Sequence, residues 1–159
     1  MDETEKTKKA ALRLLAFRPR SENELRSRLA RKKLPVESIE SVMQDLRRGG
    51  MLDDARFAKL YALSRIQSRT FGKERVKREL MQRGLSPAVV ESAMESIEDI
   101  DDRSVAEEAA RKKLATMKNL TPEAKKRRLH GTLMRRGFSV SVIFKVLDEL
   151  LGAGNDEGL

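Results

Sequence analysis

Residues 76–97, which read VKRELMQRGLSPAVVESAMESI, decide the fold. Val76 and Leu80 lie four residues apart, as apolar residues on one face of an α-helix do, and Gly84 suits the left-handed residue that ends such a helix. The Ser-Pro pair at 86–87 is typical of a helix start, because proline at the first helical position loses no hydrogen bond. Apolar residues then recur at i, i+3, i+4 and i+7, which predicts a second helix. They are Val90, Ala93, Met94 and Ile97.

The same pattern recurs on both sides of this stretch. When Leu80 is aligned with Leu29 and Leu133, the offsets are 51 and 53 residues. The apolar residues four positions earlier also align, and so do the quartets that follow. The first copy has Leu25 followed by Ile39, Val42, Met43 and Leu46, and the third has Leu129 followed by Ile143, Val146, Leu147 and Leu150. Offsets of this length accommodate three helices each, so the sequence predicts three copies of one helical unit.

We therefore expect an all-α protein built from three tandem three-helix, helix-turn-helix-like repeats. The repeats are predicted at 1–52, 53–99 and 100–151, followed by a flexible tail at 152–159. Because a unit of about 50 residues buries only a modest core, neighbouring units should pack together into an elongated, curved array. The nine helices are predicted near 4–17, 21–32, 36–48, 53–69, 73–83, 87–98, 102–117, 122–136 and 140–151.

Polar residues stand where several of these helices should begin. Ser21 has capping-box spacing with the glutamate three residues later. Asp53-Asp54 and Asp101-Asp102 open the first helices of the second and third repeats, where negative charge suits the exposed N–H groups. The first repeat departs from the others at Lys33, where they carry glycine.

Composition excludes several classes of protein. The chain has 159 residues and no cysteine, so it holds no disulfide, no thiolate zinc site and no cysteine nucleophile. No apolar run approaches the roughly 20 residues that a membrane span needs, and the first residues lack an apolar signal core, so we expect a cytoplasmic protein. The formal net charge of +9 favours polyanions or acidic protein surfaces as partners.

The positive charge is concentrated on the second helix of each repeat. Residues 124–147 contain no acidic residue, whereas a solvated helix normally mixes both signs. This distribution indicates an anionic partner, although cations that merely solvate a helix face are the alternative. The cations of these helices are Arg26, Arg28, Arg31, Lys32 and Lys33; Lys73, Arg75, Lys77, Arg78 and Arg83; and Lys125, Lys126, Arg127, Arg128, Arg135 and Arg136. All of them except Lys32 and Lys33 are the candidate contact residues.

Base-specific DNA reading does not fit this charge distribution. In helix-turn-helix proteins the last helix enters the major groove, but here the third helices carry acidic residues such as Glu91 and Glu95, which face phosphates poorly. Nonspecific contact with the DNA backbone through the second helices stays open, and it would depend strongly on salt.

We find no pattern of an enzyme, a cofactor site or a metal site. His130 is the only histidine, and we expect it at a surface or boundary rather than as a metal ligand or a base. Phe57 and Tyr61 lie at i, i+4 and are predicted to pack in the core or between repeats. The other phenylalanines are also expected to be packing anchors. They are Phe17, Phe71, Phe138 and Phe144.

The segment Met51-Leu52-Asp53-Asp54-Ala55-Arg56-Phe57-Ala58 is similar to the Leu-Asp-Asp-x-Arg-Phe-Ala segment of the RecX family of regulatory proteins. Further matches are 71–76, 79–84 and the stretch from Ala11 to Leu25, so the resemblance covers about residues 8–151. The residues that carry the motif are Asp53, Asp54, Arg56, Phe57, Arg65, Gly72 and Gly84. The resemblance does not decide whether these residues are structural or contact a partner.

The resemblance implies a function that the residue patterns alone do not give. RecX proteins bind the RecA recombinase and lodge in the helical groove of the RecA–single-stranded DNA filament. There they hinder its extension and the ATPase, strand-exchange and coprotease activities of RecA. This implies a monomeric, non-enzymatic regulator without cofactor that modulates recombination, DNA repair and the SOS response, with nonspecific contact to single-stranded DNA. The alternatives are a nonspecific DNA-binding architectural protein that acts through its basic second helices, and an adaptor for another acidic protein.

Overall fold

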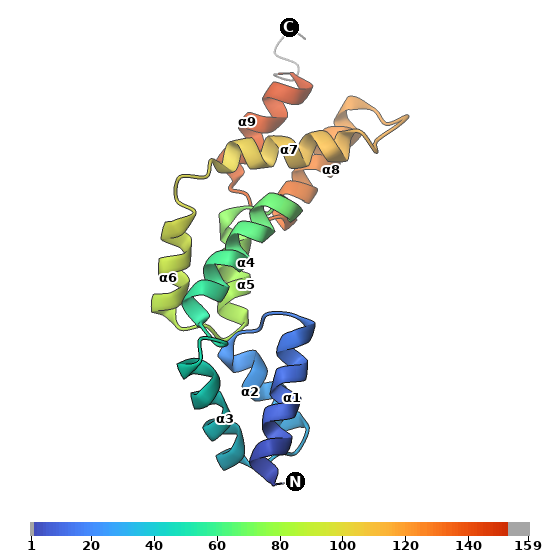
Figure 1. Cartoon of the computed structure of the whole chain (residues 1–159). Coiled ribbons are helices and arrows are strands. Elements are labelled where there is room, and N and C mark those ends of the chain that lie inside the picture. Colours follow the sequence, from blue (N-terminus) through green and yellow to red (C-terminus); the bar gives the residue numbers. More distant parts are fainter. Residues whose placement is uncertain (1, 153–159) are drawn as a thin grey trace, which may run out of the picture. The chain divides into compact units, whose positions relative to one another are not determined.

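The computed structural model describes residues 2–152, and within them the chain forms nine α-helices and no strand (Figure 1). The helices are α1 (Glu3–Phe17), α2 (Glu22–Arg31), α3 (Val36–Arg48), α4 (Asp54–Arg69), α5 (Lys73–Gln82), α6 (Pro87–Ser96), α7 (Asp102–Leu114), α8 (Pro122–Arg135) and α9 (Val140–Leu151). The all-α prediction of three successive helix triplets is confirmed. The largest difference from the predicted ends is at α7, which stops at Leu114 rather than near 117. The predicted tail lies outside the described residues from 153 onward.

The chain divides into two compact units. One contains residues 1–61 and 80–93, and the other contains residues 62–79 and 94–159. The division runs through α4, α5 and α6, so each unit combines one outer repeat with part of the middle one. In the first unit α1, α2 and α3 pack on one another, and in the second α7, α8 and α9 do. The predicted repeat boundaries and the curvature of the array stay predictions.

The core of the first repeat follows the predicted apolar pattern. Leu25, Leu29 and Met43 are completely buried, and they form one cluster with the other apolar residues of α3. Ala11 brings α1 into the same cluster. One cluster thus draws on all three helices, as expected for so short a unit, because a chain of this size buries only a modest core.

The core of the third repeat has the same arrangement. Leu129 and Leu133 from α8 are completely buried, and so are Ile143 and Val146 from α9. Leu150 at the end of the predicted quartet is only half-buried. The middle repeat keeps the pattern too, with one half-buried member, Met94. The periodicity therefore predicted the core faces of the helices correctly.

Two of the predicted packing anchors are exposed. Phe71 and Phe138 are buried as expected, but Phe17 is 82% exposed and Phe144 is 51% exposed, so the prediction is wrong for both. Helix geometry gives the reason, since successive residues point about 100° apart. Phe17 lies six residues beyond the buried Ala11, and Phe144 follows the buried Ile143 directly, so both fall outside the apolar stripes of their helices.

Side-chain caps confirm several predicted helix starts. The Ser21 Oγ accepts from the Glu24 N–H at 3.2 Å, the Asp53 Oδ1 from the Arg56 N–H at 3.1 Å and the Thr121 Oγ1 from the Ala124 N–H at 3.1 Å. The first repeat has a lysine at its left-handed turn position. Lys33 has a φ of 61°, matching the positive φ of the glycines at 84 and 137. Among the described helices, none is long and apolar enough to cross a membrane.

Candidate interaction surface

The two aspartates of each Asp-Asp pair have different partners. Asp53 and Asp101 each cap their own helix, the latter accepting from the Arg103 N–H at 3.2 Å. The second aspartate instead reaches the preceding repeat. Asp54 Oδ1 accepts from the Glu22 N–H at 2.9 Å, and Asp102 Oδ1 accepts from the Lys73 N–H at 3.3 Å. The second aspartate thus caps the second helix of the preceding repeat in both units, a role that the sequence analysis did not find.

These second aspartates are half-buried carboxylates. Burial raises the pKa of Asp54 and of Asp102, and in each case a backbone hydrogen bond opposes that shift by favouring the charged form. A raised pKa means that the folded protein binds the proton more tightly than the unfolded chain does. Unfolding then releases protons, so this contribution to stability falls as the pH rises through the range above the ordinary aspartate pKa of about 4.

Replacing Asp102 by asparagine should therefore change how stability depends on pH. We expect Asp102→Asn to keep an oxygen that accepts from the Lys73 N–H while removing the buried charge, so its stability relative to the wild type should increase from pH 4 to pH 7. Asp102→Ala, which loses the cap, should be about 1 kcal/mol less stable than the asparagine variant at either pH. Urea unfolding at the two pH values measures both differences. A constant gap between Asp102→Asn and the wild type would contradict the assigned pKa shift.

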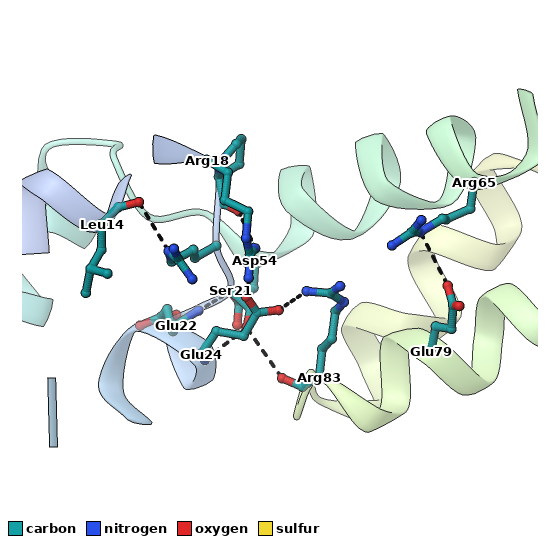
Figure 2. Close-up of polar contacts among 11 residues, drawn as sticks. Leu14, Arg18, Ser21, Glu22, Glu24, Asp54, Arg65, Glu79 and Arg83 are labelled. Carbon is teal, nitrogen blue, oxygen red and sulfur yellow. Dashed lines mark hydrogen bonds and ion pairs between the residues drawn. The ribbon is translucent and has the colours of Figure 1, made fainter. Parts of the chain in front are cut away.

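In the first unit, the start of α2 meets the end of α5 (Figure 2). Ser21 donates its hydroxyl to the Arg83 carbonyl oxygen at 3.4 Å. The Arg83 guanidinium pairs with Glu24 and lies 4.5 Å over the ring of Tyr61. Gly84 leaves room for Asn23, whose Cγ would lie 2.7 Å from a Cβ at this position. Arg83 therefore serves as a structural cation in this contact.

In the second unit, the start of α5 meets the end of α8 in the equivalent way. The Gly72 N–H donates to the Arg136 carbonyl oxygen at 2.7 Å. The Arg136 guanidinium donates to the Arg69 carbonyl oxygen and, at 3.1 Å, to Thr70 Oγ1. Arg75 lies 3.7 Å over the ring of Phe71. Burial, with the charges of Arg75 and Arg69, lowers the pKa of Arg136. The second helices thus meet end to start in each unit.

The predicted contact residues form two groups: those whose side chains bond to other parts of the fold, and those without an ion pair or side-chain hydrogen bond in the described chain. Arg83 and Arg136 hold the contacts between second helices. Arg75 also belongs to this group, because it donates to the Arg135 carbonyl oxygen at 3.0 Å. Lys73 donates to the Glu98 carbonyl oxygen at 2.9 Å, and Arg26 pairs with Glu40 at 2.7 Å. Arg135 is exposed, with only a 3.5 Å contact from its guanidinium to Thr132 Oγ1.

The remaining cations have no ion pair and no side-chain hydrogen bond within residues 2–152, and we call them the unpaired cations. Those on α8 are Lys125 to Arg128, of which Arg127 and Arg128 are exposed. Those on α5 are Lys77 and Arg78, both exposed. The first repeat contributes Arg28, Arg31, Lys32 and Lys33. Since a charge without an internal partner is available to a bound anion, these residues are the candidate interaction surface of each unit, those of the first repeat in the first and those of α5 and α8 in the second.

Most residues of the Asp-Asp-x-Arg-Phe motif and its downstream matches have structural contacts. Phe57 stacks on Tyr61 with ring centroids 5.8 Å apart, and Arg65 pairs with Glu79 at 3.4 Å. Gly72 admits no side chain, because a Cβ there would lie 2.7 Å from the Gly137 carbonyl carbon. Arg56 is exposed, its backbone N–H donates to Asp53 Oδ1, and its side chain has no ion pair or hydrogen bond within residues 2–152.

The described residues hold no group of three or more histidines, aspartates or glutamates that could bind a metal ion. His130 is half-buried, as expected for a boundary residue, and contacts the ring of Phe144 edge-on with centroids 6.0 Å apart. Residues 2–152 present exposed basic side chains and, between their helices, ion-paired contacts.

Comparison with known proteins agrees with this arrangement of repeats. Models of the first, second and third three-helix domains of RecX match residues 8–46, 53–94 and 101–147, in that order. The regulatory protein RecX of Thermobifida fusca is 33% identical over 142 residues, which are 89% of this chain and 77% of that protein. That of Pelodictyon phaeoclathratiforme is 33% identical over 92% of this chain and 91% of its own length.

A solved structure shares the fold. The crystal structure of RecX from Lactobacillus salivarius has a TM-score of 0.74 and 20% sequence identity, over 94% of this chain and 97% of that one. The three domain models together account for most of the chain. The chain belongs to the RecX family of regulatory proteins.

Proposed function

We propose that this protein is a non-enzymatic, monomeric regulator that binds the RecA–single-stranded DNA filament in its helical groove. Bound there, it inhibits the recombinase, ATPase and coprotease activities of RecA. It thereby modulates recombination, DNA repair and the SOS response in the cytoplasm. The observation that carries this proposal is the match of all three RecX domain models, in order, to one chain.

The charge of the second helices supports a partner that is negatively charged. The unpaired cations of α5 and α8 have no acidic residue of the described chain to neutralise them, and residues 124–147 contain no acidic residue at all. A filament of protein on DNA offers phosphates and acidic side chains, both of which such a surface attracts. The end-to-start contact between α5 and α8 supports the same view, because it holds these cations on neighbouring helices of the second unit.

A nonspecific DNA-binding architectural protein is the second candidate, and the unpaired cations favour it as well. The two candidates differ in what the cations have to recognise. Under the second one, affinity for bare DNA at physiological salt should be high and should fall steeply with added salt, and RecA should make no difference.

The deciding experiment measures ATP turnover by RecA on single-stranded DNA while this protein is added. We expect turnover to fall at amounts well below one molecule per RecA protomer, because a protein that blocks a filament acts on many protomers at once. RecA without DNA serves as the control for a direct effect on the enzyme. Unchanged turnover at saturating concentration would overturn the proposal, and inhibition that disappears when extra bare DNA is supplied would support the architectural protein instead.

A further inference from the structure

A basic hollow lies beside α1 in the first unit, and Lys32 is the one member of its lining that is also among the unpaired cations. It encloses about 510 Å³, and its charged lining consists of Lys6, Lys9, Arg13, Arg20 and Lys32. Its lining includes no acidic residue, and an aromatic ring, Phe17, completes it. A volume of this size is in the range of sites that bind small molecules.

The positive charge of the hollow is not neutralised by the described part of the chain. Lys6 pairs with Glu3 at 3.4 Å, but both of these side chains are largely exposed, so this ion pair is weak. Lys9, Arg13 and Lys32 have no ion pair and no side-chain hydrogen bond to any residue in the range 2–152. Like charges gathered around one hollow repel one another, and an anion between them would remove that repulsion.

Arg20 is the unusual member of this group, because it is only 7% exposed. Its Nε donates to the Leu14 carbonyl oxygen at 3.2 Å, but its Nη1 is buried and has no hydrogen-bond partner among the described residues. A buried donor without a partner destabilises the fold. Burial, together with the charges of Arg18 and Arg28, also lowers the pKa of Arg20. A bound anion would offset the repulsion between this guanidinium and the neighbouring cations.

Phe17 gives the hollow a second kind of contact. It is 82% exposed, the highest value among the large apolar side chains of the described chain. An aromatic ring beside several cations is the combination that binds nucleotides, because a base stacks on the ring while the phosphate lies among the cations. An acidic peptide would use the cations but would gain little from the exposed ring.

We propose that the hollow beside α1 binds a nucleotide unit, with its phosphate among Lys9, Arg13 and Arg20 and its base on Phe17. The nucleotide belongs either to single-stranded DNA or to a free nucleoside phosphate, since both present the same chemistry. This site is distinct from the unpaired cations of α5 and α8. It requires no RecA, so it can be tested on this protein alone, separately from the proposed function.

The test is fluorescence anisotropy with a labelled short oligothymidylate, using the full chain. We expect Phe17→Ala to weaken binding about tenfold, and Lys9→Gln with Arg13→Gln to weaken it by at least as much. The matched controls are Phe144→Ala, which removes another exposed ring, and Lys59→Gln with Lys113→Gln, which removes the same charge elsewhere. Circular dichroism checks that the helix content of each variant is unchanged. Losses no larger than those of the controls would overturn the site.

An abasic oligonucleotide separates ligand contact from a structural role of Phe17. It should bind the wild type about tenfold more weakly than the oligothymidylate does. The Phe17→Ala variant, which has already lost the stacking contact, should bind the abasic oligonucleotide and the oligothymidylate equally. Competition with ATP in the absence of metal identifies the source: displacement at micromolar concentration assigns the site to a free nucleotide, and displacement only at far higher concentration assigns it to a strand. Equal competition by polyglutamate would show a site for acidic peptides and overturn the proposal.

Discussion

Gly137→Ala should lower the free energy of unfolding by about 3 kcal/mol. Two costs combine at this position. Gly137 has a φ of 91°, which a residue with a side chain adopts at a cost of about 1–2 kcal/mol. In addition, a Cβ there would lie 2.6 Å from the Arg75 backbone nitrogen, and overpacking against backbone costs about 1–3 kcal/mol. The clash falls on the contact between the start of α5 and the end of α8, so the second unit should lose this contact. Urea unfolding followed by circular dichroism measures the change.

Gly50→Ala is the matched control for this substitution. Gly50 has a comparable φ of 76°, but a Cβ there would meet no atom within 4 Å. Only the conformational cost remains, so we expect a loss of about 1 kcal/mol. The difference between the two variants isolates the close packing of the second helices. Equal losses would show that this packing contributes nothing to stability.

Arg127→Glu with Arg128→Glu should raise the concentration of this protein needed to inhibit RecA by about tenfold or more. Both side chains are exposed, and neither has an internal partner within residues 2–152. Their reversal therefore leaves the described contacts of the fold intact and places two negative charges in the stretch 124–147, which otherwise contains no acidic residue. Repulsion then replaces attraction toward phosphates or acidic groups of the filament. ATP turnover by RecA on single-stranded DNA, measured over a range of concentrations, gives the shift.

Lys59→Glu with Lys113→Glu is the control for the charge reversal. Both lysines are exposed and, within the described chain, without an ion pair, so the change in net charge is the same. If the effect depends on location, this control should inhibit RecA almost as well as the wild type does. Equal loss in both variants would show that total charge, rather than the surface of α8, determines binding. Arg136 is unsuitable for such a test, because its guanidinium holds Arg69 and Thr70.

The helices and their core faces were predictable because both depend on local spacing. Ile39 and Leu46 in α3, for example, are seven residues apart, and helix geometry alone places them on one side. The hydrogen-bond partners of Asp54 and Asp102 were not predictable in the same way. Asp53 and Asp54 follow the same helix-start pattern, yet Asp54 bonds to Glu22, which is 32 residues away in sequence. No rule of local capping distinguishes Asp53 from Asp54. Only the packing of one repeat on the next decides which of the two carboxylates bonds to the preceding repeat instead of to its own helix.

The candidate surface was predictable in outline, because the number and location of cations are visible in the sequence. The sequence did not show which of these cations form ion pairs in the fold. Arg83 and Glu24 lie 59 residues apart, and only the fold brings them together. The cations of the basic hollow could have been found in the sequence, since Lys6, Lys9 and Arg13 have the spacing i, i+3 and i+7 of one helix face. The acidic residues among the first five residues of the chain hid this signal, because they make the net charge of the segment unremarkable.

The hydrogen bonds of Asp54 and Asp102 determine when, during synthesis of the chain, α2 and α5 can become fully capped. A ribosome releases the chain from its N-terminus, so α2 emerges before Asp54, and α5 emerges before Asp102. Neither helix can acquire its full set of caps until the beginning of the next repeat has been synthesised. The helix α8 has no such delay, because its cap, Thr121, and its first residue, Pro122, belong to the same local stretch of sequence. Each newly made repeat thus completes the one before it, and a chain halted at a repeat boundary would expose an incompletely capped helix.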